Sequence, residues 1–119
     1  MTLTTVARSA RRAPGLLMSV STEGAATVVA LRGEADIATL PDVKEMLDRV
    51  IRAHDGPLIV ELADTPFIDS GTVRALAQAS RVLGERGRRM TIRSPSPMAV
   101  RVMELFGLCG LIVPGSDDQ

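Results

Sequence analysis

The sequence predicts an α/β domain with a mixed sheet of four to five strands and helices packed on it. Two apolar runs near the start are separated by Thr22-Glu23-Gly24, which is typical of a β-hairpin. Helical and strand-like patterns then alternate to the end of the chain, as in a sheet with parallel crossovers. At 119 residues the chain has room for one core. We expect a single domain over 15–115, a flexible basic tail over 1–14 and a polar end over 116–119.

The first half of the chain predicts a hairpin and one helix. Residues 16–20 and 25–31 are the strands of the hairpin, and a loop follows over 33–37. Thr39-Leu40-Pro41-Asp42 combines a capping hydroxyl, a proline in the first turn and an acid three residues after the threonine, which indicates a helix start. Apolar residues then recur at helical spacing as far as Ile51, before Asp55-Gly56-Pro57 ends the helix.

The second half repeats the order of strand and helix. The predicted elements are a buried strand over 57–63, a loop over 64–69, a helix from Ser70 to about Gly84, a strand over 90–93, a helix opened by 94–97 and a last strand or short turn over 111–113. In the third helix we expect Met98, Val102, Met103 and Phe106 to share one face, and we expect Cys109 to be a small buried hydrophobe.

The composition argues against several functions. Fourteen basic residues balance fourteen acidic ones, and the chain has no Trp or Tyr, so we expect neither direct nucleic-acid binding nor a membrane surface as partner. The single cysteine excludes an internal disulfide. With no secretory leader and no apolar run near the ~20 residues that span a bilayer, the pattern indicates a cytoplasmic protein.

Enzyme and metal chemistry find little support in the residues. His54, the only histidine, follows the first predicted helix beside Asp55-Gly56, and no nucleophile-elbow pattern surrounds Ser70. Asp64 and Asp69 are two acids in one loop, for which turn capping is commoner than metal binding. No glycine-rich phosphate loop occurs. We therefore expect no catalytic residue, no metal and no cofactor.

Ser70 lies at or next to the N-cap of the second predicted helix. Its oxygen can accept from the N–H groups of the first turn, and a negative charge on it is favoured by the helix dipole. Phosphorylation would add a charge of about −1.5 to −2, which the helix start tolerates and which neighbouring Asp69 repels. From the residues alone, Ser70 is either a helix cap or a phosphate acceptor.

Three segments, in this order and spacing, resemble the STAS domain of bacterial anti-sigma factor antagonists. They are Gly33-Glu34-Ala35-Asp36-Ile37, Phe67-Ile68-Asp69-Ser70 and the stretch from Ser96 to Leu108, and the likeness covers about 16–114. In that family an Asp-Ser pair is followed by Ser or Thr, then Gly and Leu, and the first serine is phosphorylated. The resemblance implies that Ser70 is the acceptor. Because Gly71 and Thr72 exchange the expected order, Thr72 is a second candidate.

The resemblance implies partner switching in the regulation of transcription, as in stress responses. The unmodified protein would bind an anti-sigma factor that is also a kinase-type ATPase and so release a sigma factor; phosphorylation would break that complex and a serine/threonine phosphatase would restore it. The expected contact surface comprises Glu34, Asp36, Asp64, Phe67, Ile68, Asp69, Ser70, Gly71, Thr72 and Val73.

Two alternatives remain open from the sequence. The altered Gly71-Thr72 order favours a STAS adapter that binds a partner in a sensor or transporter assembly without being phosphorylated. The other is an unrelated small enzyme or ligand-binding domain that uses Ser70 as nucleophile or anion site. A Met- and Val-rich sheet edge is compatible with a homodimer.

Overall fold

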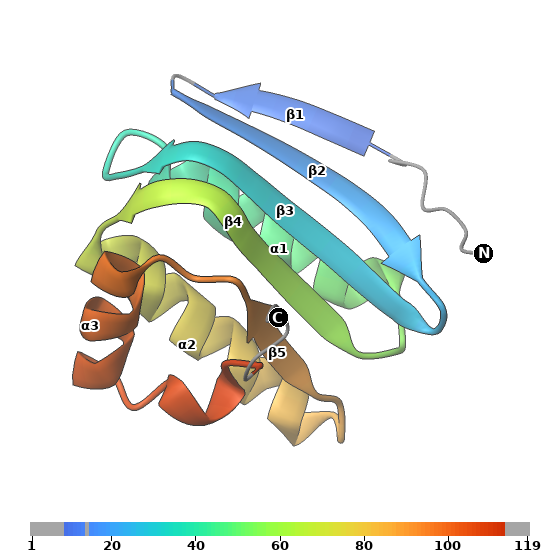
Figure 1. The fold of residues 1–119 in the computed structure, drawn as a ribbon. Coiled ribbons are helices and arrows are strands. Elements are labelled where there is room, and N and C mark those ends of the chain that lie inside the picture. The colour runs from blue at the N-terminus through green and yellow to red at the C-terminus, as the bar shows by residue number, and fades with distance from the viewer. Residues whose placement is uncertain (1–8, 14, 114–119) are drawn as a thin grey trace.

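A five-stranded mixed sheet forms the centre of the molecule (Figure 1). The computed structural model describes residues 9–13 and 15–113. In spatial order the strands are β1 (Ser9–Ala13), β2 (Leu16–Glu23), β3 (Ala26–Ala35), β4 (Leu58–Ile68) and β5 (Met90–Arg93). The first three strands pair antiparallel, and β3, β4 and β5 pair parallel. The predicted opening hairpin and mixed sheet are confirmed.

Two helices connect the parallel strands and lie behind the sheet in Figure 1, α1 (Leu40–Ala53) and α2 (Ser70–Glu85). Each returns from the carboxyl end of one parallel strand to the amino end of the next, so the two helices run in the same direction. Their N-termini therefore lie at the same edge of the sheet. A third helix, α3 (Pro97–Leu105), lies beside α2, and a 3₁₀ helix, η1 (Cys109–Leu111), follows it.

The core lies between the sheet and the helices. Alternate side chains of β2 and β4 point into it, because successive residues of a strand face opposite sides. These are Leu16, Met18, Val20, Leu58, Val60 and Leu62, and each is at most 5% exposed. The apolar stripe of α1 packs against them through Val43, Met46, Leu47, Val50 and Ile51. The helical spacing in the sequence predicted this stripe correctly.

Both loops predicted next to the functional segments are shorter than expected. The loop expected over 33–37 is strand as far as Ala35, and the loop expected over 64–69 is strand as far as Ile68. The β3–β4 ladder shifts register between Ala30 and Arg32 and again between Arg32 and Glu34. Such irregularities break the alternation of buried and exposed residues that reveals a strand in sequence. The expected loops were therefore wrong in extent.

Gly33 has a steric role in this irregular stretch. Its φ is +117°, and a Cβ built there would lie 2.2 Å from the carbonyl oxygen of Gly15. Only glycine fits where β3 approaches the start of β2 this closely. The adjacent amide, that of Glu34, donates to the same Gly15 oxygen at 2.8 Å.

The ends of the chain depart from the expectations in several ways. Residues 9–13 form β1, so the flexible tail expected over 1–14 is wrong for them; residues 1–8 and 14, and the polar end at 116–119, lie outside the described residues. Where a last strand or short turn was expected over 111–113, the chain forms the short turn η1, slightly earlier, and a single bridge between Ile112 and Ile92. Cys109, expected to be buried, is exposed; Met98, expected to share one helix face with Met103, is also exposed, whereas Met103 is buried.

Candidate functional site

The parallel pairing of β3 and β4 brings two of the expected contact segments together. Glu34 pairs with Phe67 and Ala35 with Ile68, and the Asp69 amide donates to the Ala35 carbonyl at 3.0 Å. Because parallel strands end at the same edge of the sheet, the chain beyond each strand meets there, where α/β proteins commonly bind their ligands. Glu34 and Phe67 are both exposed.

Asp69, and not Ser70, is the N-cap of α2. Its backbone is extended (φ −89°, ψ 170°), and its Oδ1 accepts from the Thr72 amide at 2.9 Å. Ser70 is therefore the first residue of the helix, with its side chain exposed. Among the described residues no hydrogen bond is found for the Ser70 hydroxyl. The hydroxyl can thus be modified without loss of the cap that starts the helix.

The other residues of the Ser70 segment differ in accessibility. Gly71 is half-buried, and a Cβ there would lie 3.4 Å from Cδ2 of Leu40, at the start of α1. Ile68, Thr72 and Val73 are at most 1% exposed. The sequence analysis included these three residues in the expected contact surface, but their side chains are buried beneath it. The Thr72 hydroxyl is buried and has no hydrogen-bond partner among the described residues, so a kinase could reach it only after local unfolding.

Asp36 shapes the turn between β3 and α1. Its Oδ1 accepts from the amides of Ala38 at 3.0 Å and Thr39 at 3.2 Å. Thr39 was expected to cap α1, but its hydroxyl bonds the Asp36 backbone instead, accepting from the amide at 3.0 Å and donating to the carbonyl at 3.1 Å. Asp36 is therefore half-buried and committed to turn structure, so its side chain has little capacity left for a partner.

Asp64 lies away from the Ser70 segment. Its Oδ2 accepts from Nε of Arg32 on the neighbouring strand at 3.3 Å, in an ion pair that is more than half exposed on both sides. Asp69 is occupied in capping, so the two acids do not act together. Within the described ranges, no cluster of three or more His, Cys, Asp or Glu side chains could hold a metal ion.

Two exposed apolar side chains at this edge were missed by the sequence analysis. Ile37, in the turn after β3, is 80% exposed, and Met98, in the first turn of α3, is 53% exposed. The start of α3 is held near the end of β4 because the Ser96 hydroxyl donates to the Pro66 carbonyl at 3.4 Å. With Phe67 at 40% exposure, these side chains give the edge around Ser70 an apolar character. Ile37 and Met98 both lie in segments that carry the family resemblance, and that was the signal that could have pointed to them.

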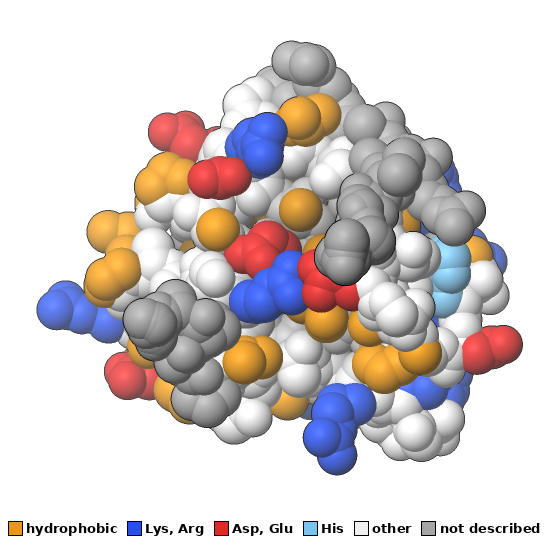
Figure 2. All heavy atoms as spheres, turned by 45° about the vertical axis from the view of Figure 1, so that its right-hand side comes forward, with side chains coloured by type: hydrophobic (Ala, Val, Ile, Leu, Met, Phe, Trp, Pro, Cys, Tyr) orange, Lys and Arg blue, Asp and Glu red, His pale blue; other side chains and the backbone are white. Residues whose placement is uncertain are grey.

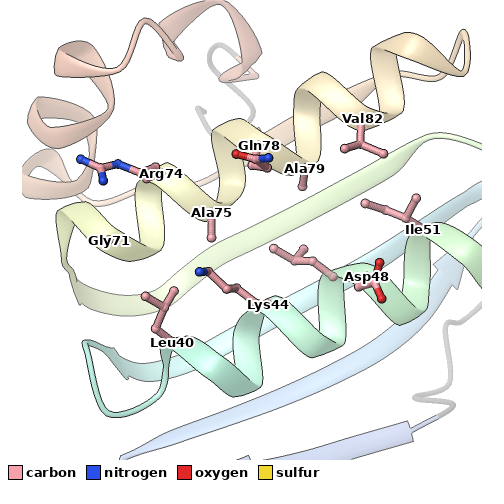
Figure 3. Close-up of a pocket in the computed structure, with 11 residues that line it drawn as sticks. Leu40, Lys44, Asp48, Ile51, Gly71, Arg74, Ala75, Gln78, Ala79 and Val82 are labelled. Carbon is pink, nitrogen blue, oxygen red and sulfur yellow. The ribbon is translucent and has the colours of Figure 1, made fainter.

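A groove between α1 and α2 opens beside the same edge (Figure 3). Its volume is about 490 Å³. The lining residues are Leu40, Lys44, Leu47, Asp48 and Ile51 of α1, and Gly71, Arg74, Ala75, Gln78, Ala79 and Val82 of α2. Arg74 also lies over the ring of Phe106, with its guanidinium carbon 5.6 Å from the ring centre. Sequence periodicity marked Leu40, Leu47 and Ile51 as core, missed the apolar lining positions of α2, and could not show that a groove lies between the helices.

His54 is remote from Ser70. Gly71 lies against Leu40 at the start of α1, whereas His54 is the C-cap at the other end of this 14-residue helix. A helix of this length is about 21 Å long. The geometry therefore does not allow a catalytic triad that includes both residues.

The opposite face of the sheet carries a cluster of three charged side chains. Arg93 of β5 donates to Glu61 of β4 and, through both terminal nitrogens, to Glu23 of β2 at 2.9 Å. The hydrogen bonds from Arg93 lower the pKa of Glu23, against a smaller effect of burial. The same bonds, first to Glu23 and then to Glu61, raise the pKa of Arg93. Figure 2 shows basic and acidic side chains adjoining one another among hydrophobic ones on the face it presents.

Comparison with known families identifies the domain. A family model described as "Mlab, STAS domain" matches residues 18–114. The chain belongs to the STAS domain family. This STAS chain gave no significant sequence match among curated proteins. Among the described residues, no helix combines the length and apolar character needed to cross a membrane.

Solved structures with the same STAS fold include bacterial and mammalian proteins. An anti-sigma factor antagonist from Mycobacterium paratuberculosis is 24% identical, with 87% of this chain and 89% of that one covered and a TM-score of 0.75. The Bacillus cell fate determinant SpoIIAA in its phosphorylated form is 19% identical, with coverage of 81% and 88% and a TM-score of 0.67. The murine anion transporter Slc26a9 is 15% identical, with coverage of 76% and 16% and a TM-score of 0.55. At these identities the likeness establishes the fold.

Proposed function

We propose that this STAS domain is an anti-sigma factor antagonist that binds an anti-sigma factor with kinase activity and is switched off by phosphorylation of Ser70. The observation that carries the proposal is that Ser70 is exposed as the first residue of α2 while Asp69 caps the helix. A phosphate there would meet the positive end of the helix dipole, so the fold would tolerate it. The same charge would lie on the surface that faces the partner.

Fold similarity supports this function among the activities of STAS proteins. The structures that share the fold over most of both chains include an anti-sigma factor antagonist and SpoIIAA in a phosphorylated form. The exposed apolar side chains Ile37, Phe67 and Met98 around Ser70 give the edge an affinity for protein surfaces. A small domain with this surface can act by binding alone, and a serine/threonine phosphatase would reset it.

The proposal is tested by replacing Ser70. Ser70→Asp should weaken binding to the kinase-type anti-sigma factor at least tenfold. The substitution adds a second negative charge beside Asp69, on the surface proposed to face the partner, and so makes the contact unfavourable. Affinity is measured by isothermal titration calorimetry, with circular dichroism to establish that the fold is native. Ser70→Ala is the matched control: it should bind as tightly as the wild type and should not be phosphorylated. Full affinity of the Ser70→Asp protein would contradict the proposed switch.

Mass spectrometry of the natively expressed protein tests the modification itself. We expect one phosphatase-sensitive phosphate, mapped to Ser70. Phosphate on Thr72 would show that the buried hydroxyl becomes accessible and would move the switch along the chain.

A second function is a STAS adapter that binds its partner without phosphorylation. The match to a family model described as "Mlab, STAS domain" and the Gly71-Thr72 order favour it. In this case no phosphate should be found at Ser70 under any growth condition, and the protein should be recovered in a stable assembly.

A further inference from the structure

Arg74 lies one helical turn after Ser70 on the exposed face of α2. The two residues are four positions apart, so they share one face of the helix, with about 5–6 Å between their Cβ atoms. Both are exposed, as are Gln78 and Arg81 at the following helical steps. Because side chains on a helix lean toward its N-terminus, the guanidinium of Arg74 extends over the turn that begins with Ser70. In Figure 3 it is directed toward the start of α2, where Gly71 lies.

In the unmodified protein the guanidinium of Arg74 lies over an aromatic ring. Its central carbon is 5.6 Å from the ring centre of Phe106, the C-cap of α3. Within the part of the chain that the structure describes, Arg74 forms no salt bridge, and the residue is exposed. A cation–π contact at an exposed position is weak. The positive charge of Arg74 is therefore available to a stronger partner.

The phosphate proposed at Ser70 is a partner of this kind. A phosphoserine carries three acceptor oxygens and a charge of about −1.5 to −2, and the planar fork of a guanidinium pairs with two phosphate oxygens at once. Neighbouring Asp69 caps the helix and repels the phosphate. The cation Lys44 lines the same groove as Gly71, but it belongs to α1 and binds a phosphate as a point charge. Arg74 is thus the better placed cation.

We infer that Arg74 binds the phosphate on Ser70: on modification its guanidinium leaves the Phe106 ring and forms an ion pair with the phosphoserine. The modification itself rests on the proposed function, whereas the pairing rests on the geometry of α2. The ion pair holds the new charge on the surface of α2 beside Asp69. Because Phe106 loses its cation, the change at Ser70 also reaches the end of α3.

A double-mutant cycle on the full chain tests the pairing. Phosphoserine is incorporated at position 70 during translation, and urea denaturation compares modified and unmodified protein, each with Arg74 and with Arg74→Gln. Arg74→Gln should lower the folding equilibrium constant of the phosphorylated protein by about threefold or more beyond its effect on the unmodified protein, because only the phosphorylated protein loses an ion pair. Equal effects on the two forms would overturn the inference.

Two variants control for the position of the cation. Arg81→Gln makes the same change at an exposed position of α2 about 17 Å from Ser70 along the helix axis, and it should show no coupling to the phosphate. Lys44→Gln removes the cation of the neighbouring helix and should couple less strongly than Arg74→Gln. A coupling at Lys44 equal to or larger than that at Arg74 would contradict the assignment of the phosphate to Arg74.

Phe106→Leu separates the pairing from a merely structural role of Arg74. Without the ring the guanidinium is free in both forms of the protein, so the coupling between Arg74 and the phosphate should persist or increase. If Arg74 acted only through its contact with Phe106, the coupling would disappear with the ring, and the inference would be wrong.

Nuclear magnetic resonance gives a structural readout of the same exchange of partners. With phosphoserine at position 70, the Nε–H resonance of Arg74 should move downfield and the ring protons of Phe106 should shift, whereas the Nε–H resonance of Arg81 should not change. An Arg74 resonance that is the same in both forms would show that the guanidinium does not bind the phosphate.

The inference and the proposed function can fail separately. If natively expressed protein carries no phosphate at Ser70, the proposed switch is removed, and the cycle with incorporated phosphoserine still decides whether Arg74 binds the phosphate. Conversely, if Ser70→Asp releases the anti-sigma factor while the cycle shows no coupling, the switch stands and Arg74 is not the residue that binds the phosphate.

Discussion

At the residue scale, the sequence left Ser70 as either a helix cap or a phosphate acceptor, and in the structure the capping role belongs to its neighbour Asp69. Asp69 supplies the hydrogen bond that caps α2, and Ser70 presents an exposed hydroxyl at the first helical position. An Asp-Ser pair in sequence does not show which residue caps, because both types are good N-caps. The structure decides it through the pairing of β3 with β4, which holds the Asp69 amide on Ala35 and sets where the helix begins.

Thr72 provides a test of a buried hydroxyl. Within residues 9–13 and 15–113 its Oγ1 has no hydrogen-bond partner, and the residue is 0% exposed. Thr72→Val removes the unsatisfied group at nearly constant volume and should raise the free energy of unfolding by about 1 kcal/mol, measured by urea denaturation.

The matched control for Thr72 is Thr65, which is equally buried. Its hydroxyl donates to the Leu31 carbonyl within the irregular part of the β3–β4 ladder. Thr65→Val should therefore lower the free energy of unfolding by about 1–3 kcal/mol. If Thr72→Val were as destabilising, the Thr72 hydroxyl would have a partner in solution.

At the element scale, helices were predicted more accurately than strands. The apolar stripe of α1 and the proline near its start are local signals, and they predicted the helix to within a few residues. The ends of β3 and β4 depend on each other through a ladder whose residues are about 33 positions apart in the chain, such as Glu34 and Phe67. No local pattern contains that information, so both strands were predicted too short.

The start of α2 can be tested as an element. Asp69→Ala removes the side-chain bond to the Thr72 amide and should lower the free energy of unfolding by about 1 kcal/mol. Asp69→Asn retains a capping oxygen and should retain most of that stability. Both values come from urea denaturation; a loss with Asn equal to that with Ala would show that the charge at the helix dipole, and not the hydrogen bond, stabilises the start of α2.

At the scale of the whole molecule, Arg93 joins distant parts of the sheet. It is paired with Glu61 on the adjacent strand and with Glu23 at the end of β2. These contacts hold the hairpin end of the sheet to its parallel end on the face away from the core. The sequence shows these charged residues, but it does not show that Arg93 and Glu23, which are 70 positions apart in the chain, are in contact.

This cluster predicts a pH dependence of stability. Arg93 lowers the pKa of Glu23 below its ordinary value of 4.5, so the stabilisation is fully present above that value and is lost as pH falls through the pKa of the folded state. Because the Glu23 side chain is 43% exposed, Glu23→Gln should cost less than about 1 kcal/mol at pH 7.

Denaturation of both proteins between pH 7 and 3 checks this dependence. The difference in stability between wild type and Glu23→Gln should narrow below pH 4.5. A difference that stays constant over the range would show that the Glu23 charge is not involved.

The sequence by itself determined the α/β class, the order of its main elements and the position of Ser70 at a helix start. It could do so because hydrophobic period and capping chemistry are local properties of the chain. Tertiary structure alone decided that Ile68, Thr72 and Val73 are buried, that Ile37 and Met98 are exposed beside Ser70, and that a groove lies between α1 and α2. These features depend on which elements pack together, and contacts between residues far apart in the chain leave no pattern in a single sequence.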